Sequence, residues 1–142
     1  MSVKVFLDTN ILVYLYSASE QDKRNKLCQT LNNLHRITSI QALNEASNVW
    51  FRKYNWDGTK IKKHLDNIEL ICDEVRTVTR GTVDSAISLK DTYGYSFYDC
   101  LMLASAIESD CREIFTEDMR NGQVINNLLK IINPFTHAGS SS

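Results

Sequence analysis

Short apolar runs alternate along this chain with longer segments in which apolar residues recur every three or four positions. The short runs are rich in β-branched residues, as buried strands are, and the longer spacing is typical of amphipathic helices. Strands are therefore predicted at residues 3–7, 36–38, 75–79, 114–115 and 131–132, with a polar segment at 116–127 between the last two.

The helical segments between these strands show start and stop signals. Residues Ser19 to Asp22 fit a capping box, and further helices are expected to begin after Ser39, after Gly58 and after Ser96. One helix is expected to end by Gly94. Six groups of apolar residues carry the helical spacing: Ile11, Leu12 and Leu15; Leu27, Leu31 and Leu34; Leu43, Ala46, Trp50 and Tyr54; Ile61, Leu65, Ile68 and Ile71; Val83, Ala86 and Ile87; Phe97, Leu101, Ala104 and Ile107.

Strands that alternate with helices, without repeats or a Pro/Gly-rich linker, predict an α/β fold. We expect a three-layer α/β/α sandwich around a mainly parallel central sheet. Because 142 residues fall within the usual range for one domain, a single domain is predicted at residues 1–137, followed by a disordered tail at 138–142. In such sheets the functional crevice lies beyond the carboxyl ends of the strands.

Composition narrows the class of protein. A hydrophobic content of 43% with 23% charged residues is typical of a folded globular chain. No stretch approaches the roughly 20 apolar residues of a membrane span, and the first residues lack a secretory signal, so no membrane association and a cytoplasmic location are expected. Four widely spaced cysteines, Cys28, Cys72, Cys100 and Cys111, indicate buried reduced thiols rather than a zinc site or disulfides.

A formal net charge of −1 argues against a strongly basic nucleic-acid coat but leaves RNA binding open. Basic residues group at 23–26, at 52–53 and at 60–64, where most are expected to be solvated helix faces. Local clusters of this kind can still hold a phosphate backbone.

Four acidic residues are predicted to converge at one edge of the sheet. Asp8 ends the first strand, Glu45 lies in the helix after the second, Asp99 opens a late helix, and Asp118 closely follows the strand at 114–115. Carboxylates ~4 Å apart repel by about 4 kcal/mol per pair at an effective dielectric near 20, so such a cluster requires a cation. Mg²⁺ binds a few carboxylates together with substrate phosphate oxygens, which suits phosphodiester hydrolysis.

Each acid also has a purely structural alternative. Asp8 could cap the following helix, Glu45 could be a helix-surface acid, and Asp99 could stabilise the first turn of its own helix. Asp118 competes with Glu117 for the last position. Only the joint occurrence of the acids favours a site.

In order, spacing and residue type, the acidic motifs resemble the PIN-domain nucleases, and more narrowly the VapC-type toxins. The resemblance rests on Val5-Phe6-Leu7-Asp8-Thr9-Asn10, Leu43-Asn44-Glu45, Ser96-Phe97-Tyr98-Asp99 and Thr116-Glu117-Asp118, leading to Ile131-Ile132-Asn133-Pro134-Phe135. It implies that Asp8, Glu45, Asp99 and Asp118 are the catalytic and metal-binding residues, with Thr9, Asn10 and Thr116 as polar neighbours. It further implies an endoribonuclease dependent on Mg²⁺ or Mn²⁺, usually a homodimer, that a cognate antitoxin protein inhibits.

Two other functions stay open at this point. An aspartyl phosphotransferase would use Asp8 as its nucleophile, but that function requires a second acid two residues on, where this chain has Asn10. A non-catalytic module that binds RNA or protein would keep the fold without the chemistry. The four filled acidic positions argue against this module.

The remaining aromatic and histidine residues give weaker signals. Trp50, Phe51, Tyr54 and Trp56 are expected to pack in the core or at a protein interface, with stacking on unpaired bases as the alternative. His35, His64 and His137 have no spacing that suggests a catalytic triad or a metal site, so we assign them no catalytic role.

Overall fold

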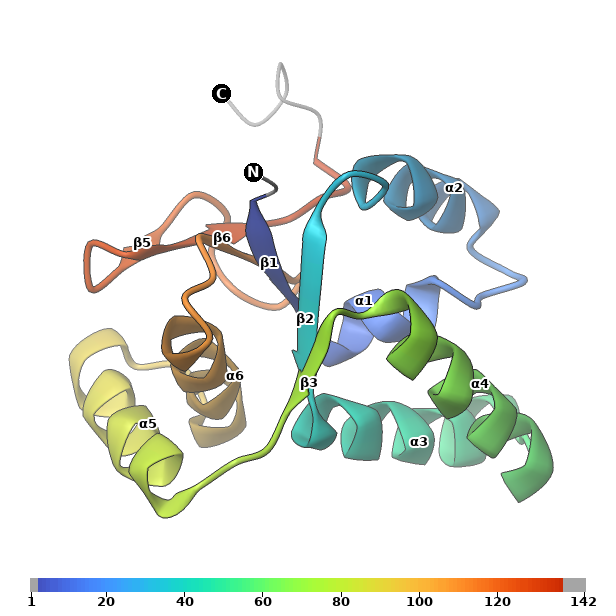
Figure 1. Cartoon of the computed structure of the whole chain (residues 1–142), viewed down its shortest axis with the longest axis horizontal. Coiled ribbons are helices and arrows are strands. Elements are labelled where there is room, and N and C mark those ends of the chain that lie inside the picture. Colours follow the sequence, from blue (N-terminus) through green and yellow to red (C-terminus); the bar gives the residue numbers. More distant parts are fainter. Residues whose placement is uncertain (1–2, 137–142) are drawn as a thin grey trace.

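The sheet at the centre of the molecule is mainly parallel, as predicted. The computed structural model describes residues 3–136, which form six strands in the order β3-β2-β1-β4-β6-β5 (Figure 1). All neighbours pair in parallel except β5 and β6, which are antiparallel. The predicted tail at 138–142 lies outside the described residues, as does His137. The strands are β1 (Lys4–Leu7), β2 (His35–Ser39), β3 (Glu74–Arg76), β4 (Glu113–Phe115), β5 (Val124–Ile125) and β6 (Leu129–Ile132).

Helices cover both faces of the sheet, which confirms the three-layer prediction. The helices of residues 3–136 are α1 (Thr9–Tyr14), α2 (Gln21–Thr30), α3 (Ile40–Tyr54), α4 (Gly58–Ile71), α5 (Arg80–Tyr93) and α6 (Phe97–Glu108). From β1 through β2 to β3 the chain moves in one direction across the sheet, and it then returns to β4. Because crossovers between parallel strands are right-handed, α1 to α4 lie on one face and α5 and α6 on the other (Figure 1).

Local sequence explains most helix boundaries. The side chain of Ser39 accepts a hydrogen bond from the first turn of α3, and Asp57 does the same for α4. At the other end, Asn55 (φ 53°) and Gly94 (φ 79°) take the left-handed conformation that closes α3 and α5. The starts of α3 and α4 and the end of α5 were predicted from the sequence to within one residue, whereas the end of α3 at Asn55 was not predicted.

Two predicted boundaries are wrong for reasons of capping. The strand predicted at 75–79 ends at Arg76, because Thr79 and Thr82 form a reciprocal capping box that starts α5. Ser19 caps nothing: Glu20 occupies the N-cap position of α2 without a side-chain hydrogen bond, and its N–H is bound by Ser17 Oγ at 3.1 Å.

Two further differences concern short elements. Helix α2 ends at Thr30, so Leu34 lies beyond it, packed against the core from the connection to β2. Strand β5 lies inside the segment predicted to be only polar, where it pairs with β6 at the sheet edge. Two residues are too few for a strand period to show in the sequence.

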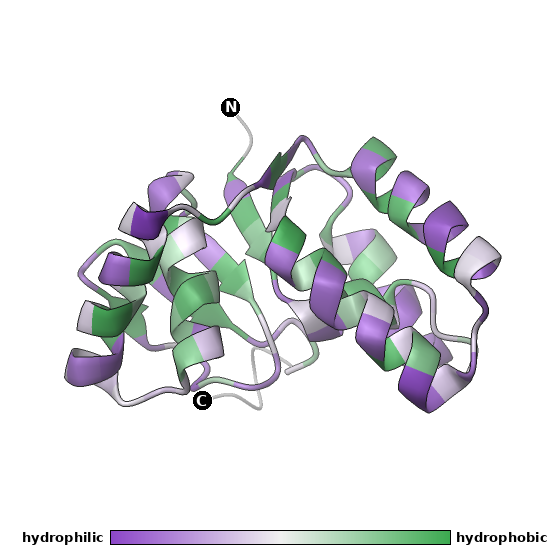
Figure 2. Cartoon of the chain, turned by 90° about the horizontal axis from the view of Figure 1, so that it is seen from below, coloured by the Kyte–Doolittle hydropathy of each residue, from purple (hydrophilic) through white to green (hydrophobic). Residues whose placement is uncertain are grey.

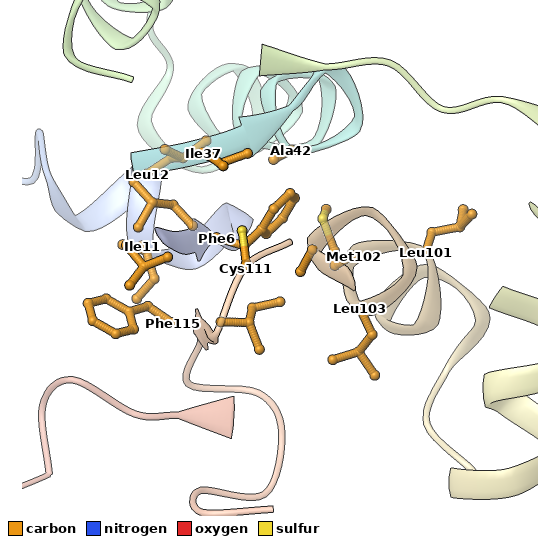
Figure 3. Packing of buried hydrophobic residues seen from close by; sticks show 14 of the residues in the cluster. Phe6, Ile11, Leu12, Ile37, Ala42, Leu101, Met102, Leu103, Cys111 and Phe115 are labelled. Atoms are coloured by element: carbon orange, nitrogen blue, oxygen red, sulfur yellow. The ribbon is translucent and has the colours of Figure 1, made fainter. Parts of the chain in front are cut away.

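Helix α6 lies between the sheet and α5. Residues 100–106 are all buried, so α6 is enclosed on every side, with the sheet on one side and α5 on the other. Other helices alternate hydrophobic and hydrophilic residues along the ribbon (Figure 2). In Figure 3, Phe6 of β1 and Met102 of α6 point into the apolar space between sheet and helix, together with Cys111.

The cysteines are all free thiols. Cys72, Cys100 and Cys111 are buried as predicted, whereas Cys28 on α2 is exposed, contrary to the prediction. Within residues 3–136, no helix combines the length and apolar character needed to cross a membrane.

Candidate active site

The site forms where the strand order reverses, between β1 and β4. The chain passes from β1 to β2 on one side, whereas β4 lies on the other side and leads toward β6. The connections that leave β1 and β4 therefore run in opposite directions from the carboxyl ends of these strands. Asp8 directly follows β1 and Thr116 directly follows β4. The backbone N–H of Asp8 donates to the carbonyl of Phe115 at 3.1 Å, which fixes the two segments side by side.

Asp8 is buried and held in one orientation. Only 4% of it is exposed. Its Oδ1 accepts the backbone N–H of Thr9 at 2.7 Å, and its Oδ2 accepts the hydroxyl of Thr116 at 2.7 Å. Burial raises the pKa of Asp8 to about 7 against the lowering effect of these hydrogen bonds, and the charges of Asp99 and Asp118 raise it further. Asp8 also caps α1, so the structural role considered from the sequence coexists with its place in the site.

Thr116 and Asn10 connect Asp8 to Asp118. Thr116 Oγ1 donates to Asp8 and accepts the backbone N–H of Asp118 at 3.1 Å. Asn10 Nδ2 donates to Asp118 Oδ2 at 2.9 Å and to Thr116 Oγ1 at 3.4 Å. The polar neighbours suggested by the sequence therefore set the relative position of the two carboxylates.

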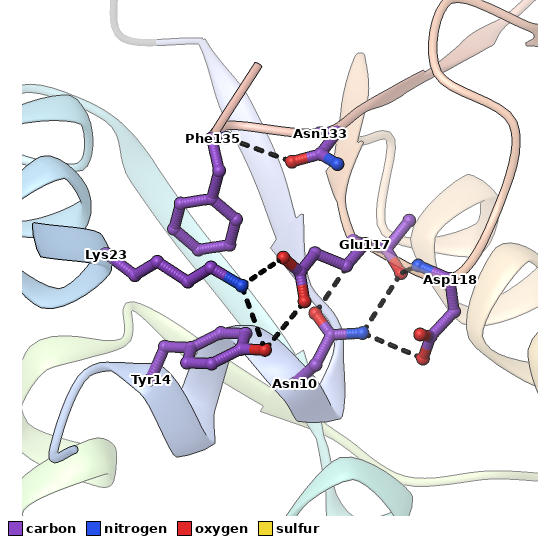
Figure 4. A network of polar contacts seen from close by, with 8 residues as sticks. Asn10, Tyr14, Lys23, Glu117, Asp118, Asn133 and Phe135 are labelled. Atoms are coloured by element: carbon purple, nitrogen blue, oxygen red, sulfur yellow. Dashed lines mark hydrogen bonds and ion pairs between the residues drawn. The ribbon is translucent and has the colours of Figure 1, made fainter. Parts of the chain in front are cut away.

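Glu117 points away from this cluster. Its carboxylate accepts hydrogen bonds from Tyr14, at 2.7 Å, and from Lys23 (Figure 4). Lys23 Nζ also lies over the rings of Tyr14 and Phe135, 4.3 and 5.1 Å from their centroids. Of the two adjacent acids, only Asp118 faces the cavity described below.

Glu45 on α3 and Asp99 on α6 reach the site from the helical layers on opposite faces of the sheet. Gln41 Nε2 donates to Glu45 Oε2 at 2.7 Å, and the hydroxyl of Thr9 lies 3.5 Å from Oε1. In the first turn of α6, Ser96 rather than Asp99 is the cap, because Ser96 Oγ accepts the Asp99 N–H at 3.1 Å. Burial raises the pKa of Asp99 against the hydrogen bond from Ser96, and the charge of Asp118 adds to the rise.

All four predicted acids line one cavity of about 370 Å³, which we call the acidic cavity. In the part of the chain that the structure describes, no three acidic, histidine or cysteine side chains lie close enough together to surround a cation as they stand. The donor set is nevertheless entirely oxygen, which is the chemistry that Mg²⁺ and Mn²⁺ prefer. The burial and like charge that raise the pKa values of Asp8 and Asp99 are what a bound cation would offset.

The profile of the PIN domain family matches residues 5–124. The chain belongs to the PIN domain family. No curated protein sequence matches this PIN domain.

Solved structures share its fold. A toxin–antitoxin complex from Klebsiella pneumoniae is similar with a TM-score of 0.69 and 19% identity, over 92% of this chain and 98% of that chain. VapBC2 from Rickettsia felis, bound to a DNA fragment from its promoter, has a TM-score of 0.65 and 20% identity over 92% and 100%. VapC20 from Mycobacterium tuberculosis, described as a toxin that cleaves the sarcin-ricin loop, has a TM-score of 0.63 and 20% identity over 80% and 89%. At such identities the likeness establishes a shared fold.

Sequence reasoning missed several residues of this PIN domain's site. Gln41, which orients Glu45, was not predicted, and neither was Lys53, a basic side chain that lines the acidic cavity. A signal for Lys53 was available. Glu45, Asn48, Val49 and Lys53 stand at helical spacing on one face of α3, and all four line the cavity.

Proposed function

We propose that this PIN domain is a metal-dependent endoribonuclease and the toxin of a toxin–antitoxin pair. One observation carries the proposal: Asp8, Glu45, Asp99 and Asp118, from four separate segments, line a single cavity at the carboxyl edge of the sheet. The likeness to VapC20 and to the two other toxin–antitoxin structures supports it.

The four carboxylates would hold Mg²⁺ or Mn²⁺. When bound, such an ion polarises a phosphoryl oxygen and lowers the pKa of water, so that hydroxide becomes available near neutral pH. The chain's own contribution is preorganisation. Thr9 and Thr116 fix both oxygens of Asp8, and Asn10 fixes one oxygen of Asp118. Asp8 and Asp118 are therefore oriented before RNA binds, which reduces the reorganisation that these two carboxylates need during the reaction.

The proposed partners are a cognate antitoxin and a second copy of the chain. An acidic cavity suits a cationic side chain, which an inhibitory protein could place among the four carboxylates. The apolar content of residues 43–54 and 61–71 favours a homodimer, but Trp50 and Ile68 of these segments are buried in the chain's own core. The proposed dimer therefore rests on exposed apolar residues such as Leu70, which is 82% exposed. The chain would meet both RNA and the antitoxin in the cytoplasm.

The test is cleavage of a total RNA pool with mapped ends. Wild-type protein with Mn²⁺ should produce discrete new ends, and addition of EDTA should abolish them. Asp99→Asn, prepared in parallel, controls for a contaminating ribonuclease because it should be inactive with Mn²⁺. If the wild type makes no metal-dependent ends, or if the variant makes the same ends, the chain is a non-catalytic module or the acids are wrongly assigned.

A further inference from the structure

A second cavity adjoins the acidic cavity. It measures about 300 Å³ and shares Val13 and Tyr54 with the acidic cavity, so the two spaces meet at these side chains. We call it the aromatic cavity and define it by the rings of Tyr16, Trp50, Tyr54, Trp56 and His64, with Lys60 at its edge. A volume of this size is at the lower end of the range for small-molecule sites.

The end of α3 builds the wall of the aromatic cavity. Because Asn55 takes the left-handed conformation, the chain turns back and the N–H of Trp56 donates to the carbonyl of Trp50 at 3.1 Å. The ring of Trp56 then stacks on that of Trp50, with centroids 5.0 Å apart and planes 12° apart. Trp50 is fully buried, whereas Trp56 keeps part of its surface exposed. Trp50 is thus part of the core, and it supports one face of the partly exposed Trp56 ring, which we call the platform.

Positive charge lies over this platform. Lys60 Nζ stands over the Trp56 ring, 4.3 Å from its centroid, so a base that stacks there displaces this ammonium group toward the neighbouring phosphate. Lys53 lines the neighbouring acidic cavity next to the shared Tyr54. Neither lysine has an ion-pair partner within residues 3–136. Flat aromatic surface flanked by unpaired cations is the combination that single-stranded nucleic acid requires, because bases stack on the rings and phosphates bind the cations.

We propose that the aromatic cavity binds one unpaired base of the RNA whose phosphodiester lies in the acidic cavity. The inference rests on the proposed function, since it names a subsite for the same substrate. The strand would pass over Tyr54, with Lys53 and Lys60 beside its phosphates and the base against Trp56. The lysines at the edge favour a polyanionic ligand over an apolar protein segment, and the shared wall places that ligand beside the four acids.

Tryptophan fluorescence can report occupancy directly, because the chain's two tryptophans, Trp50 and Trp56, both line the aromatic cavity. The probe is an eight-nucleotide single-stranded RNA, titrated in EDTA so that no cleavage occurs. Binding should quench the fluorescence. In a series of oligonucleotides with one abasic position each, a single position should weaken binding by roughly 5- to 150-fold, which is the range for loss of one base–aromatic stack.

Matched variants separate the platform from its surroundings. Trp56→Leu keeps apolar packing but removes the flat ring, and it should bind the intact and the abasic RNA equally, as measured by the anisotropy of dye-labelled RNA because the variant lacks one of the two tryptophans. Its control is Phe51→Leu, an exposed aromatic on α3 that lines neither cavity. Lys60→Gln should weaken binding and flatten its dependence on salt, whereas Lys62→Gln, the same change two residues along α4, should leave both unchanged. Lys60→Gln keeps the test decisive if Trp56→Leu folds poorly.

The outcomes distinguish this subsite from the nuclease assignment. If the wild type cleaves RNA with Mn²⁺ but the abasic series is flat and Trp56→Leu binds normally, the subsite is wrong and the nuclease stands. If RNA quenches fluorescence with a position-specific abasic effect but is never cleaved, the subsite stands and the nuclease fails. A fluorescence change that follows protein concentration without RNA would assign this face to a contact between two copies of the chain, and it would overturn the proposal.

Discussion

The side-chain amide of Asn10 donates a hydrogen bond to Asp118 Oδ2 at 2.9 Å, although 108 residues separate them in sequence. The oxygen of the same amide accepts the backbone N–H of Glu117 at 3.3 Å. One side chain on α1 therefore binds both the backbone and the acid of the loop after β4. Asn10 thus orients one carboxylate of the acidic cavity.

Replacing Asn10 by alanine should weaken metal binding. The segment after β4 would lose three hydrogen bonds, to Thr116, Glu117 and Asp118, at a cost of roughly 1 to 3 kcal/mol in unfolding free energy, and Asp118 would be free to turn toward solvent. The rise in thermal midpoint on adding Mn²⁺ should be smaller than in the wild type. Asn48→Ala is the control because Asn48 lines the same cavity on α3. Equal Mn²⁺ responses in Asn10→Ala and the wild type would contradict the orienting role.

Asp99→Asn and Ser96→Ala should have opposite effects. Since Ser96 is the cap of α6, its replacement should cost about 1 kcal/mol of stability and spare metal-dependent cleavage. Asp99→Asn removes one of several like charges, so the metal-free protein should be equally stable or more stable, and RNA cleavage should be lost. Thermal midpoints in EDTA and cleavage rates with Mn²⁺ measure both. Full cleavage by Asp99→Asn would remove Asp99 from the site.

The stability of the metal-free protein should fall as pH rises, because of Asp8. Its pKa is raised to about 7 in the folded protein. The neutral form therefore favours folding below the unfolded pKa near 4, and this contribution declines between pH 4 and 7, by roughly 4 kcal/mol in total. Urea unfolding in EDTA between pH 4.5 and 8 should show the decline in the wild type. Asp8→Asn, which stays neutral, should lack it, and parallel pH profiles of the two proteins would refute the burial effect.

Glu117→Gln should leave RNA cleavage nearly unchanged, whereas Asp118→Asn should abolish it. Glu117 binds Lys23 and Tyr14 away from the acidic cavity, and that ion pair is partly exposed, so its loss should cost no more than about 1 kcal/mol. Cleavage rates at saturating Mn²⁺ measure the contrast. If Glu117→Gln were the inactive variant instead, the orientation of the loop during the reaction would differ from the one in Figure 4.

The fold was predictable because its elements carry local signals. The buried strand ending at Leu7 and the Ser39 cap of α3 could be recognised from residue type and spacing alone. Errors arose where two local signals competed. Thr79 has the β-branched character of a strand residue, yet its hydroxyl starts α5. The weak edge strand β5 depends on pairing with β6, which is a tertiary contact that no local pattern reveals.

The candidate site was predictable only in part. Asp8 and Asp118 follow strand ends, and Glu45 and Asp99 lie in the first two turns of their helices, so the topology of a parallel sheet was enough to group them. Which of Glu117 and Asp118 faces the cavity depends on contacts with Lys23 and Asn10, about 100 residues earlier in the chain. The junction of the acidic and aromatic cavities likewise depends on how α3 packs against α1, and spacing within one helix does not determine that packing.

The acidic cavity has two walls that should differ in amide hydrogen exchange: the end of β1, which carries Asp8, and the loop that carries Asp118. Strand β1 is paired on both sides, and the N–H of Asp8 is itself bound to Phe115, so its exchange requires opening of the central sheet. Asp118 lies in a loop held by side-chain hydrogen bonds, which can open while the sheet stays intact. The protein can therefore lose one wall of its site transiently without unfolding, and the other wall is as durable as the domain itself.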